Sequence, residues 1–256
     1  MENPVVIIGI GEIGGVFARG FLRCGYTVVP ARRSDQLAAL AQRVSSPALV
    51  LVAVAEADLH AVLETIPAAW RGSLALIQNE LLPADWQRHG LEHPTVMSIW
   101  FEKKKGQDAK ILLSSPAWGP GAALLVDALG AVGIPGRTLA SADDLEYELL
   151  RKNVYILTTN IAGLACGGNV EELWRHHREL AESVAADVMD IQGVLSGTSL
   201  DRSRLIEGLA EGIAGDPAHQ CMGRSAPARL SRALQIADEF DLPVPTLRHI
   251  AKTHPA

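Results

Sequence analysis

The sequence predicts an α/β fold, in which a Rossmann-type, doubly wound parallel sheet is followed by an all-helical C-terminal domain. In the first half of the chain, apolar runs of strand length alternate with segments of helical periodicity, which is the pattern of parallel strands joined by crossover helices. From Ala142 onward the helical periodicity continues without strand-like runs. We therefore expect one domain over residues 1–140 and a helical domain over residues 141–256.

The first apolar run, residues 5–10, has the composition of a strand that is buried on both faces. The helical pattern that follows makes Phe17, Phe21 and Leu22 available for one face. Further strands are expected at residues 26–31, 48–54, 73–77, 95–101 and 110–113, the last after a hairpin tip at residues 103–108. Helices of this half are expected at residues 13–24, 35–43, 57–66 and 119–132, with a short one after Pro83.

The second half is expected to contain helices alone. Residues 143–166 form one long periodic segment that ends at Gly167-Gly168, a typical helix stop. Further helices are expected around residues 176–195, 203–213, 226–240 and 246–252.

The composition limits the class of protein. Of the 256 residues, 48% are hydrophobic and 20% are charged, as in soluble globular chains. A formal net charge of −6 argues against a broad nucleic-acid surface. No uncharged run reaches the length of a spanning helix, so no membrane partner is expected. Three widely spaced cysteines form no disulfide or zinc pattern, which favours a cytoplasmic protein.

A glycine motif lies between the first strand and the first helix. Gly9-Ile10-Gly11-Glu12-Ile13-Gly14 fits G-x-G-x-x-G, in which the glycines serve a tight turn, the approach of a pyrophosphate and close helix–strand packing. The N-terminus of the following helix would offer free N–H groups to phosphate. This setting predicts a dinucleotide site at Gly9, Gly11, Glu12, Ile13 and Gly14; the alternative is a glycine turn of purely structural role.

The end of the second strand indicates which dinucleotide is bound. An NAD site would place Asp or Glu there, whereas this chain has Arg32-Arg33 followed by Ser34. Guanidinium groups match a 2′-phosphate with charge-assisted hydrogen bonds. Arg32 and Arg33 therefore favour NADP(H). The alternative is two solvated arginines, with Ser34 capping the next helix.

Two segments carry a family resemblance. Gln78-Asn79 follows the fourth strand, and the long helix contains the segment Glu148-Leu-Leu-Arg-Lys-Asn-Val-Tyr-Ile-Leu-Thr-Thr-Asn160. With the cofactor domain, these segments make nearly the whole chain resemble ketopantoate reductase (2-dehydropantoate 2-reductase). The segment from Asp241 to Pro245 is similar to the turn before that family's last helix.

The resemblance implies roles for three residues. Lys152 would donate a proton to the carbonyl oxygen of the substrate, where negative charge develops. Asn79 would lie near the nicotinamide, and Asn160 would contact the substrate. Lys152 and Asn160 are eight residues apart, about 12 Å along a helix, on broadly the same side. The alternatives are a solvated lysine, a strand-exit asparagine and a buried asparagine that bonds helix backbone.

The sequence also departs from the family. Val54-Ala55-Glu56 stands where a second lysine usually follows the third strand. In the long helix, Ile156 replaces the first asparagine. Glu80 replaces the glycine of the Gln-Asn-Gly motif.

The largest departure concerns substrate binding. The family's late glutamate, which binds the substrate's hydroxyl, has no clear counterpart in residues 220–227, where Ser225 falls near its place. Arg224, Arg229 and Arg232 either meet an anionic substrate or form a solvated basic helix face. We therefore expect Ser225 to contact the substrate, and the specificity to differ from that for ketopantoate.

No metal site is expected, because His89/His93 and His176/His177 are not placed as helical ligand pairs. Cys221 near His219 lacks the third group that a thiol nucleophile needs. The lysines at residues 103–105 are expected to form a solvated hairpin tip.

These features predict an NADPH-dependent reductase that transfers hydride to the carbonyl of a small 2-oxo acid or a related, anionic carbonyl compound. Two alternatives stay open: an imine- or opine-type reductase on the same scaffold, and a non-catalytic NADP-sensing protein. The resemblance also implies a homodimer through the helical domain, because related reductases often dimerise in this way.

Overall fold

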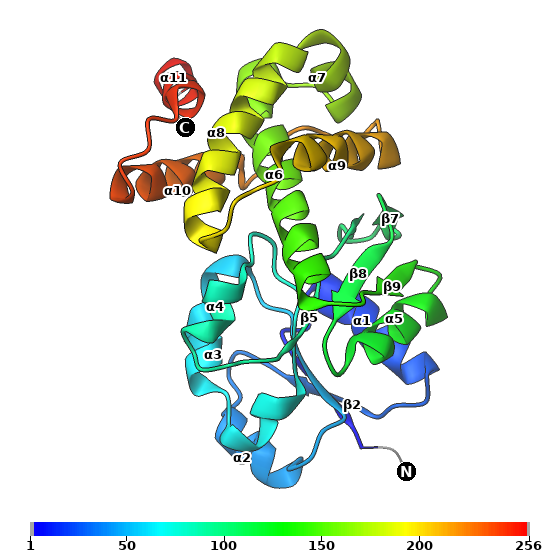
Figure 1. The fold of residues 1–256 in the computed structure, drawn as a ribbon. Helices are drawn as coiled ribbons and strands as arrows, with labels where there is room; N and C mark the ends of the chain where they lie inside the picture. Colours follow the sequence, from blue (N-terminus) through cyan, green and yellow to red (C-terminus); the bar gives the residue numbers. More distant parts are fainter. Residues whose placement is uncertain (1–2, 255–256) are drawn as a thin grey trace. The chain divides into compact units, whose positions relative to one another are not determined.

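The structure, a computed structural model, describes residues 3–254. The chain divides into two compact units, one up to Leu149 and the other from Leu150 onward. The division lies inside a single long helix, α6 (Ala142–Cys166). In Figure 1 the α/β unit is coloured blue to green and the helical unit green to red.

The first unit is built on a seven-stranded sheet with the order β2-β1-β3-β4-β5-β8-β9. Its strands are β1 (Val5–Ile8), β2 (Val28–Ala31), β3 (Leu49–Val52), β4 (Leu74–Leu76), β5 (Thr95–Met97), β8 (Ser115–Trp118) and β9 (Gly136–Thr138). The five neighbouring strands β2, β1, β3, β4 and β5 pair with one another in parallel. The strands that follow β1 in sequence lie on its two sides, so the strand order reverses there, which is where open α/β sheets bind ligands.

Helices cover both faces of this sheet. They are α1 (Glu12–Arg23), α2 (Leu37–Arg43), α3 (Leu59–Thr65), α4 (Pro83–Gln87) and α5 (Ala122–Ala131), with short 3-10 turns at Glu56–Asp58 and Ala68–Ser73. Figure 1 shows α1 and α5 side by side on one face and α2, α3 and α4 on the other. A Cβ at Gly20 of α1 would lie 2.1 Å from the carbonyl oxygen of Ala128 in α5, so glycine permits this close helix contact. The predicted Rossmann-type class is confirmed.

The sheet differs from the expectation at one edge. Strands β8 and β9 are not predicted by the sequence, and β8 pairs antiparallel with β5, so the sheet is not parallel throughout. The sequence does not predict β8 because this segment contains Pro116, and a proline within an apolar run argues against a central strand. The Pro116 carbonyl still accepts a hydrogen bond from the Ser98 N–H at 2.9 Å.

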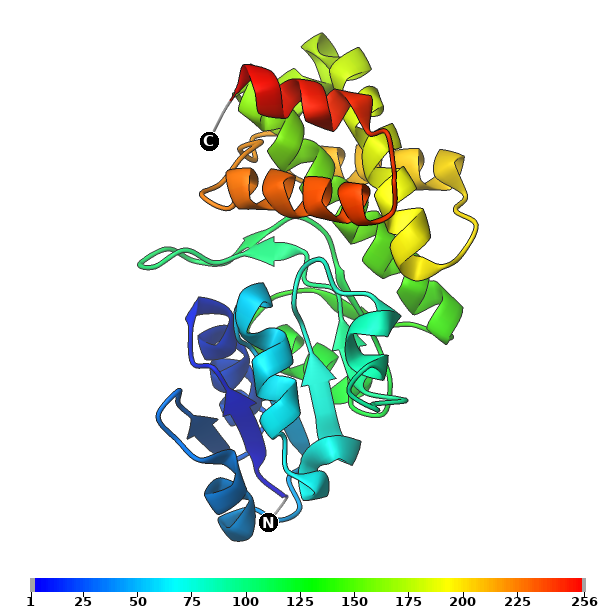
Figure 2. The ribbon, with the colours of Figure 1, turned by 90° about the vertical axis from the view of Figure 1, so that its left-hand side faces the viewer.

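The expected strand at residues 95–101 is in fact two strands. The first is β5, and the second, β6 (Phe101–Glu102), pairs with β7 (Lys110–Ile111) in a separate two-stranded sheet. The hairpin expected around residues 103–108 is thus confirmed. Figure 2 shows it as an arm that extends away from the main sheet.

The second unit is helical, as expected. Besides most of α6 it contains α7 (Val170–His176), α8 (Arg178–Ser196), α9 (Arg202–Gly215), α10 (Ala226–Glu239) and α11 (Pro245–Thr253). The segment around residues 176–195 belongs to two helices rather than one, because α7 ends at His176 and α8 begins at Arg178. Asn169 caps α7 in a capping box with Glu172, which fixes where this helix begins.

The last helix is held by a buried carboxylate. Asp187 of α8 accepts hydrogen bonds from the N–H groups of Thr246 and Leu247 at 2.7 and 3.0 Å. These are first-turn N–H groups of α11, which have no partners within the helix. The turn before it holds two non-glycine residues at positive φ, Asp241 at 54° and Val244 at 33°.

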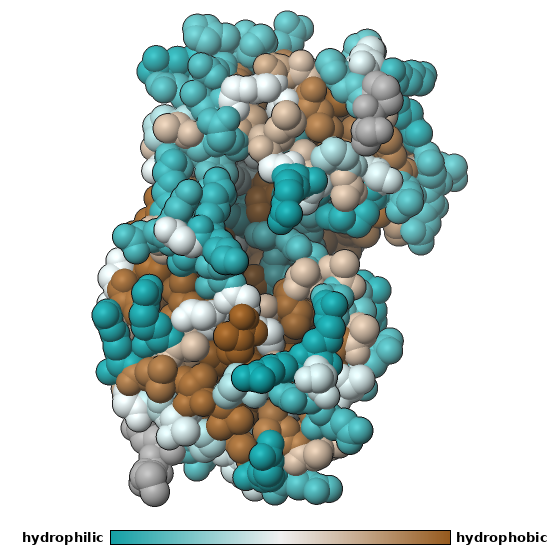
Figure 3. Space-filling model, turned by 180° about the vertical axis from the view of Figure 1, so that it is seen from behind, coloured by the Kyte–Doolittle hydropathy of each residue, from teal (hydrophilic) through white to brown (hydrophobic). Residues whose placement is uncertain are grey.

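The surface of both units mixes polar and apolar residues. On the face in Figure 3, hydrophobic residues in brown gather mainly over the first unit, at the bottom of the view. Among the helices of residues 3–254, none combines the length and the apolar character that crossing a membrane requires.

Candidate active site

The glycine turn has the geometry of a dinucleotide-binding turn. Gly9 has φ +95°, and a Cβ there would lie 2.7 Å from the carbonyl oxygen of Ala53, just past β3. A Cβ at Gly14 would lie 2.1 Å from the Gly9 carbonyl oxygen. Both positions therefore require glycine, for the conformation of the turn and for the packing of α1 on it.

Gly11 differs from these two glycines. Its φ is −85°, and a Cβ there would meet no atom of the described residues within 4 Å. Steric packing within the protein thus does not explain a glycine at this position, whereas the approach of a ligand to the backbone does. Gly11 is also the N-cap of α1 and has no side chain to cap its N–H groups. The side chain of Ile13, in the first turn of α1, packs against the hydrophobic core. Only its backbone is therefore available to a ligand at the glycine turn.

A lysine that the sequence analysis assigned to a solvated tip lies against this turn instead. Lys103, at the end of β6, places its Nζ 3.0 Å from Oε2 of Glu12, and its side chain is only 15% exposed. Glu12 is the first residue of α1. The ion pair compensates a carboxylate that would otherwise repel an anion at the helix N-terminus. Lys105 of the same hairpin is exposed, as expected.

Arg32 and Arg33 follow β2, which pairs with β1, so they lie at the same edge of the sheet as the glycine turn. Both are exposed. The guanidinium of Arg33 pairs with Asp58 Oδ2 at 2.7 Å. No ion pair or hydrogen bond engages the Arg32 side chain within residues 3–254. Of the two, Arg32 is therefore the one whose charge stands uncompensated.

Gln78 and Asn79 lie at the end of β4. The buried Gln78 amide donates to the carbonyl oxygen of Val52 at 2.7 Å, so this residue ties β4 to β3. Asn79 Nδ2 donates to Glu56 Oε1 at 3.0 Å. Glu80 has φ 61°, so the chain keeps a glycine-like conformation here, at a cost of about 1–2 kcal/mol for a residue with a Cβ. Such strain is typical of functional turns.

Lys152 lies on α6 in the helical unit and is buried, with 8% of its surface exposed. Burial lowers its pKa from 10.5 to about 7, helped by the positive charges of Arg229 and then Arg151. Its Nζ lies 5.7 Å from the centroid of the Tyr155 ring. A buried amine that titrates near neutral pH is a group that can give or take a proton there.

Asn160, two turns further along α6, is joined to Ser225 by an arginine. Nη1 of Arg229 donates to Asn160 Oδ1 at 3.0 Å and to Ser225 Oγ at 2.8 Å. The structure therefore brings these two expected substrate residues together and links them to a third, which also acts on Lys152. Asn79 belongs to the other unit.

The three arginines near Ser225 do not share one environment. Arg224 and Arg232 are exposed, as expected of a basic helix face, but Arg229 is only 9% exposed. The sequence contains a signal for this, because the buried residues of α10 are Ala226, Arg229, Leu230, Ala233 and Ala237. That spacing is the apolar stripe of a helix, and Arg229 lies on it.

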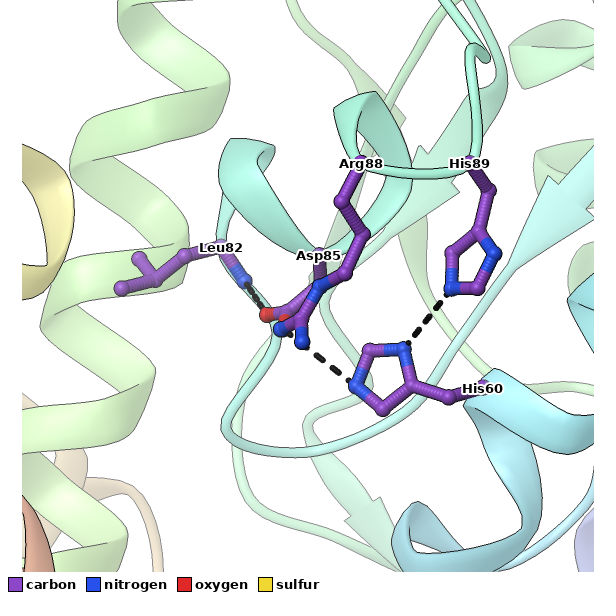
Figure 4. Close-up of polar contacts among 5 residues, drawn as sticks. All are labelled: His60, Leu82, Asp85, Arg88 and His89. Atoms are coloured by element: carbon purple, nitrogen blue, oxygen red, sulfur yellow. Dashed lines mark hydrogen bonds and ion pairs between the residues drawn. The ribbon is translucent and has the colours of Figure 1, made fainter.

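A cluster of titratable groups on α3, on α4 and in the turn after α4 resembles a proton relay but is explained by local structure. His60 Nδ1 lies 3.0 Å from His89 Nε2, and Asp85 Oδ1 lies 3.6 Å from His60 Nε2 (Figure 4). Asp85 is held by Arg88 at 2.5 Å and accepts from the Leu82 N–H, as an α4 capping group. Burial is the main cause that lowers the pKa of His60, and the positive charge of Arg88 is the next. No group of three or more metal ligands occurs within residues 3–254.

Cys221 is not an activated nucleophile. The residue is buried, and burial raises the pKa of its thiol to about 12, assisted by Cys166 and Glu172. Since the thiolate is the reactive form, this side chain stays protonated at neutral pH.

Comparison with known proteins agrees with this geometry. A family model described as NADP oxidoreductase, coenzyme F420-dependent, matches residues 4–76, the stretch from β1 to β4. A sequence comparison with curated proteins finds no significant match. Among solved structures, a ketopantoate reductase of the PanE/ApbA family from Ralstonia eutropha is similar over 98% of this chain and 96% of its own, with a TM-score of 0.68 and 16% identity.

The fold is that of the ketopantoate reductases. The 2-dehydropantoate 2-reductase from Methylococcus capsulatus is similar over 98% of this chain and 95% of its own (TM-score 0.69, 12% identity). A D-mandelate dehydrogenase solved with NADH is similar over 98% and 97% (TM-score 0.68, 13% identity). The resemblance predicted from the sequence is confirmed for the fold of both units.

Proposed function

We propose that this chain is an NADPH-dependent reductase that transfers hydride to the carbonyl carbon of a small 2-oxo acid or a related carbonyl compound. The observation that carries the proposal is Lys152, a buried amine with a pKa of about 7 that the charge of Arg229 helps to lower. The same arginine joins Asn160, on the helix of Lys152, to Ser225. A solvated surface lysine would show neither feature.

The residues of the glycine turn fit a dinucleotide. Gly11 leaves open space beside the uncapped N-terminus of α1, and N–H groups at such a terminus favour phosphate. Arg32 would meet a 2′-phosphate, and Lys103 keeps Glu12 compensated. NADPH, when bound, supplies the hydride.

Lys152 supplies the proton. As hydride reaches the carbonyl carbon, negative charge develops on the carbonyl oxygen, and the Lys152 ammonium donates its proton to that oxygen. A pKa near 7 allows the amine to be charged before the reaction and to regain its proton afterwards at neutral pH. Asn160 positions the substrate from the same helix, and Asn79 of the first unit positions the reacting groups.

Turnover of NADPH with a panel of 2-oxo acids, including 2-dehydropantoate, tests the proposal. We expect kcat/KM for reduction to be constant below about pH 7 and to fall about tenfold for each pH unit above it. Lys152→Met is expected to remove both this pH dependence and most of the rate, about 100- to 10,000-fold. Reduction that continues at an unchanged rate in Lys152→Met would refute the role of Lys152.

We infer in addition that the protein acts in the cytoplasm and as a homodimer. The first inference rests on the three free cysteines. The second rests on the neighbour from Staphylococcus aureus, whose structure is described as a dimeric ketopantoate reductase. Sedimentation of the purified chain tests the oligomeric state.

A further inference from the structure

The strand alternation of the β6–β7 hairpin distinguishes one of the three lysines at its tip. Phe101 of β6 is buried in the hydrophobic core of the first unit. Successive side chains of a strand point to opposite faces, so Lys103 continues the face of Phe101. Glu102 and Lys104 share the opposite face, where their side chains pair at 3.0 Å. Lys105 is exposed at the tip.

The ammonium of Lys103 lies at the glycine turn. Its Nζ donates to Glu12 Oε2 at 3.0 Å and to the carbonyl oxygen of Lys104 at 2.8 Å. Glu12 is the first residue of α1, and Gly11 is its N-cap. The ammonium is therefore one ion-pair length from a carboxylate at the helix start, which is where such a turn receives a pyrophosphate. Its side chain is only 15% exposed, little for a lysine on a hairpin.

The contacts of Lys103 leave part of its binding capacity unused. A lysine ammonium has three N–H groups, and the two contacts above engage two of them. Within residues 3–254 the third meets no acceptor. A pyrophosphate at the turn would also place negative charge near the Glu12 carboxylate, and these like charges repel. An ammonium that contacts both groups offsets that repulsion.

We propose that Lys103 binds the pyrophosphate of the dinucleotide through its remaining N–H group, while Glu12 keeps the ammonium at the turn. This inference rests on the proposed function for the identity of the ligand. The open space beside Gly11 lets phosphate oxygens approach the backbone on the side of α1, and Lys103 approaches the same place from the hairpin. Lys103 is thus a cofactor-binding residue and not only the counterion of Glu12.

A double-mutant cycle on NADPH binding, measured by fluorescence titration, separates these two roles. If Lys103 served Glu12 alone, Lys103→Gln would cost nothing once Glu12→Gln has removed the carboxylate. We expect Lys103→Gln to weaken NADPH binding about 10- to 50-fold in the wild-type background and still about threefold or more in the Glu12→Gln background, because a charged hydrogen bond to phosphate is lost in both. Lys105→Gln, at the exposed tip, is the matched control and should leave the affinity unchanged.

A comparison of two cofactors identifies the phosphate that Lys103 binds. NADPH and NADH share the pyrophosphate, and only NADPH carries the 2′-phosphate. Lys103→Gln should therefore weaken both by the same factor, to within about twofold, whereas Arg32→Gln should change their ratio. A loss confined to NADPH, or a loss below about threefold in the Glu12→Gln background, overturns the proposal.

These measurements need no turnover, so they separate this inference from the proposed function. If Lys103→Gln weakens both cofactors in the Glu12→Gln background but no 2-oxo acid is reduced, the inference stands and the proposed function fails. If the wild type reduces a 2-oxo acid while Lys103→Gln binds both cofactors as tightly as the wild type does, only the inference fails. A wild type that binds neither cofactor overturns both. Circular dichroism checks that each variant is folded, and Lys103→Met replaces Lys103→Gln if that variant is not.

Discussion

Replacing Lys152 with methionine has a consequence for stability that can be calculated. The pKa of Lys152 is lowered from 10.5 to about 7, and at about 1.36 kcal/mol for each pH unit the buried ammonium costs about 5 kcal/mol. The unfolded chain keeps this proton up to about pH 10.5, whereas the folded chain releases it above about pH 7. Between these values the unfolded state binds more protons, so the free energy of unfolding rises with pH.

The size of the change follows from the same two pKa values. The cost of burying Lys152 is about 4 kcal/mol at pH 7 and about 2 kcal/mol at pH 9, because releasing the proton of the unfolded chain costs less as the pH approaches 10.5. Methionine carries no such cost. The stability of Lys152→Met relative to the wild type should therefore decrease by about 2 kcal/mol from pH 7 to pH 9, whatever the change in packing contributes.

Urea unfolding at pH 7, 8 and 9, followed by far-ultraviolet circular dichroism, measures this difference. Lys105→Met, at an exposed position on the hairpin tip, is the matched control and should show a difference that does not depend on pH. If the free energies of Lys152→Met and the wild type run parallel across the three pH values, the lysine is not held in a neutral state and its assignment as a proton donor near pH 7 is wrong.

The remaining predictions concern the cofactor turn and the last helix. Arg32→Gln should weaken NADPH binding about 10- to 100-fold and NADH binding little. Arg33→Gln should weaken NADPH binding less than Arg32→Gln does, because Arg33 is already paired with Asp58. Fluorescence titration with both cofactors measures these affinities. Gly14→Ala should disrupt the turn, since its Cβ would lie 2.1 Å from a carbonyl oxygen, whereas Gly11→Ala should fold with an unchanged melting temperature and bind NADPH more weakly. Asp187→Ala should destabilise the protein by about 2–3 kcal/mol in urea unfolding, because two N–H groups of α11 lose a charged acceptor.

The parts of the site that the sequence predicts are those whose signal is local. The glycine turn is one, because the spacing of Gly9, Gly11 and Gly14 reports directly on backbone conformation and close contacts. Helix α6 is another, since a long periodic segment that ends at a glycine pair has few alternative structures. Both are found within a residue or two of the expected bounds.

The parts that it does not predict depend on contacts between distant residues. Lys103 looks like one of three equivalent lysines in the sequence, and only its contact with Glu12, 91 positions away, distinguishes it. Strand β8 is missed because its pairing with β5 and β9 outweighs the poor strand propensity of Pro116. Arg229 lies between these cases, since its place on the α10 stripe is visible in the sequence, but an arginine on an apolar stripe normally argues against burial.

The cost of burying Lys152 bears on the proposed function without any appeal to resemblance to other proteins. A protonated Lys152 costs about 5 kcal/mol, which is comparable with the whole stability of a small domain. Arg229 adds to this cost, because it is among the causes that lower the Lys152 pKa. A methionine at position 152 would fill much the same space without that cost, so packing alone gives no reason for a lysine there. Proton transfer at Lys152 does give such a reason, since that reaction needs the charge that makes this residue expensive to bury.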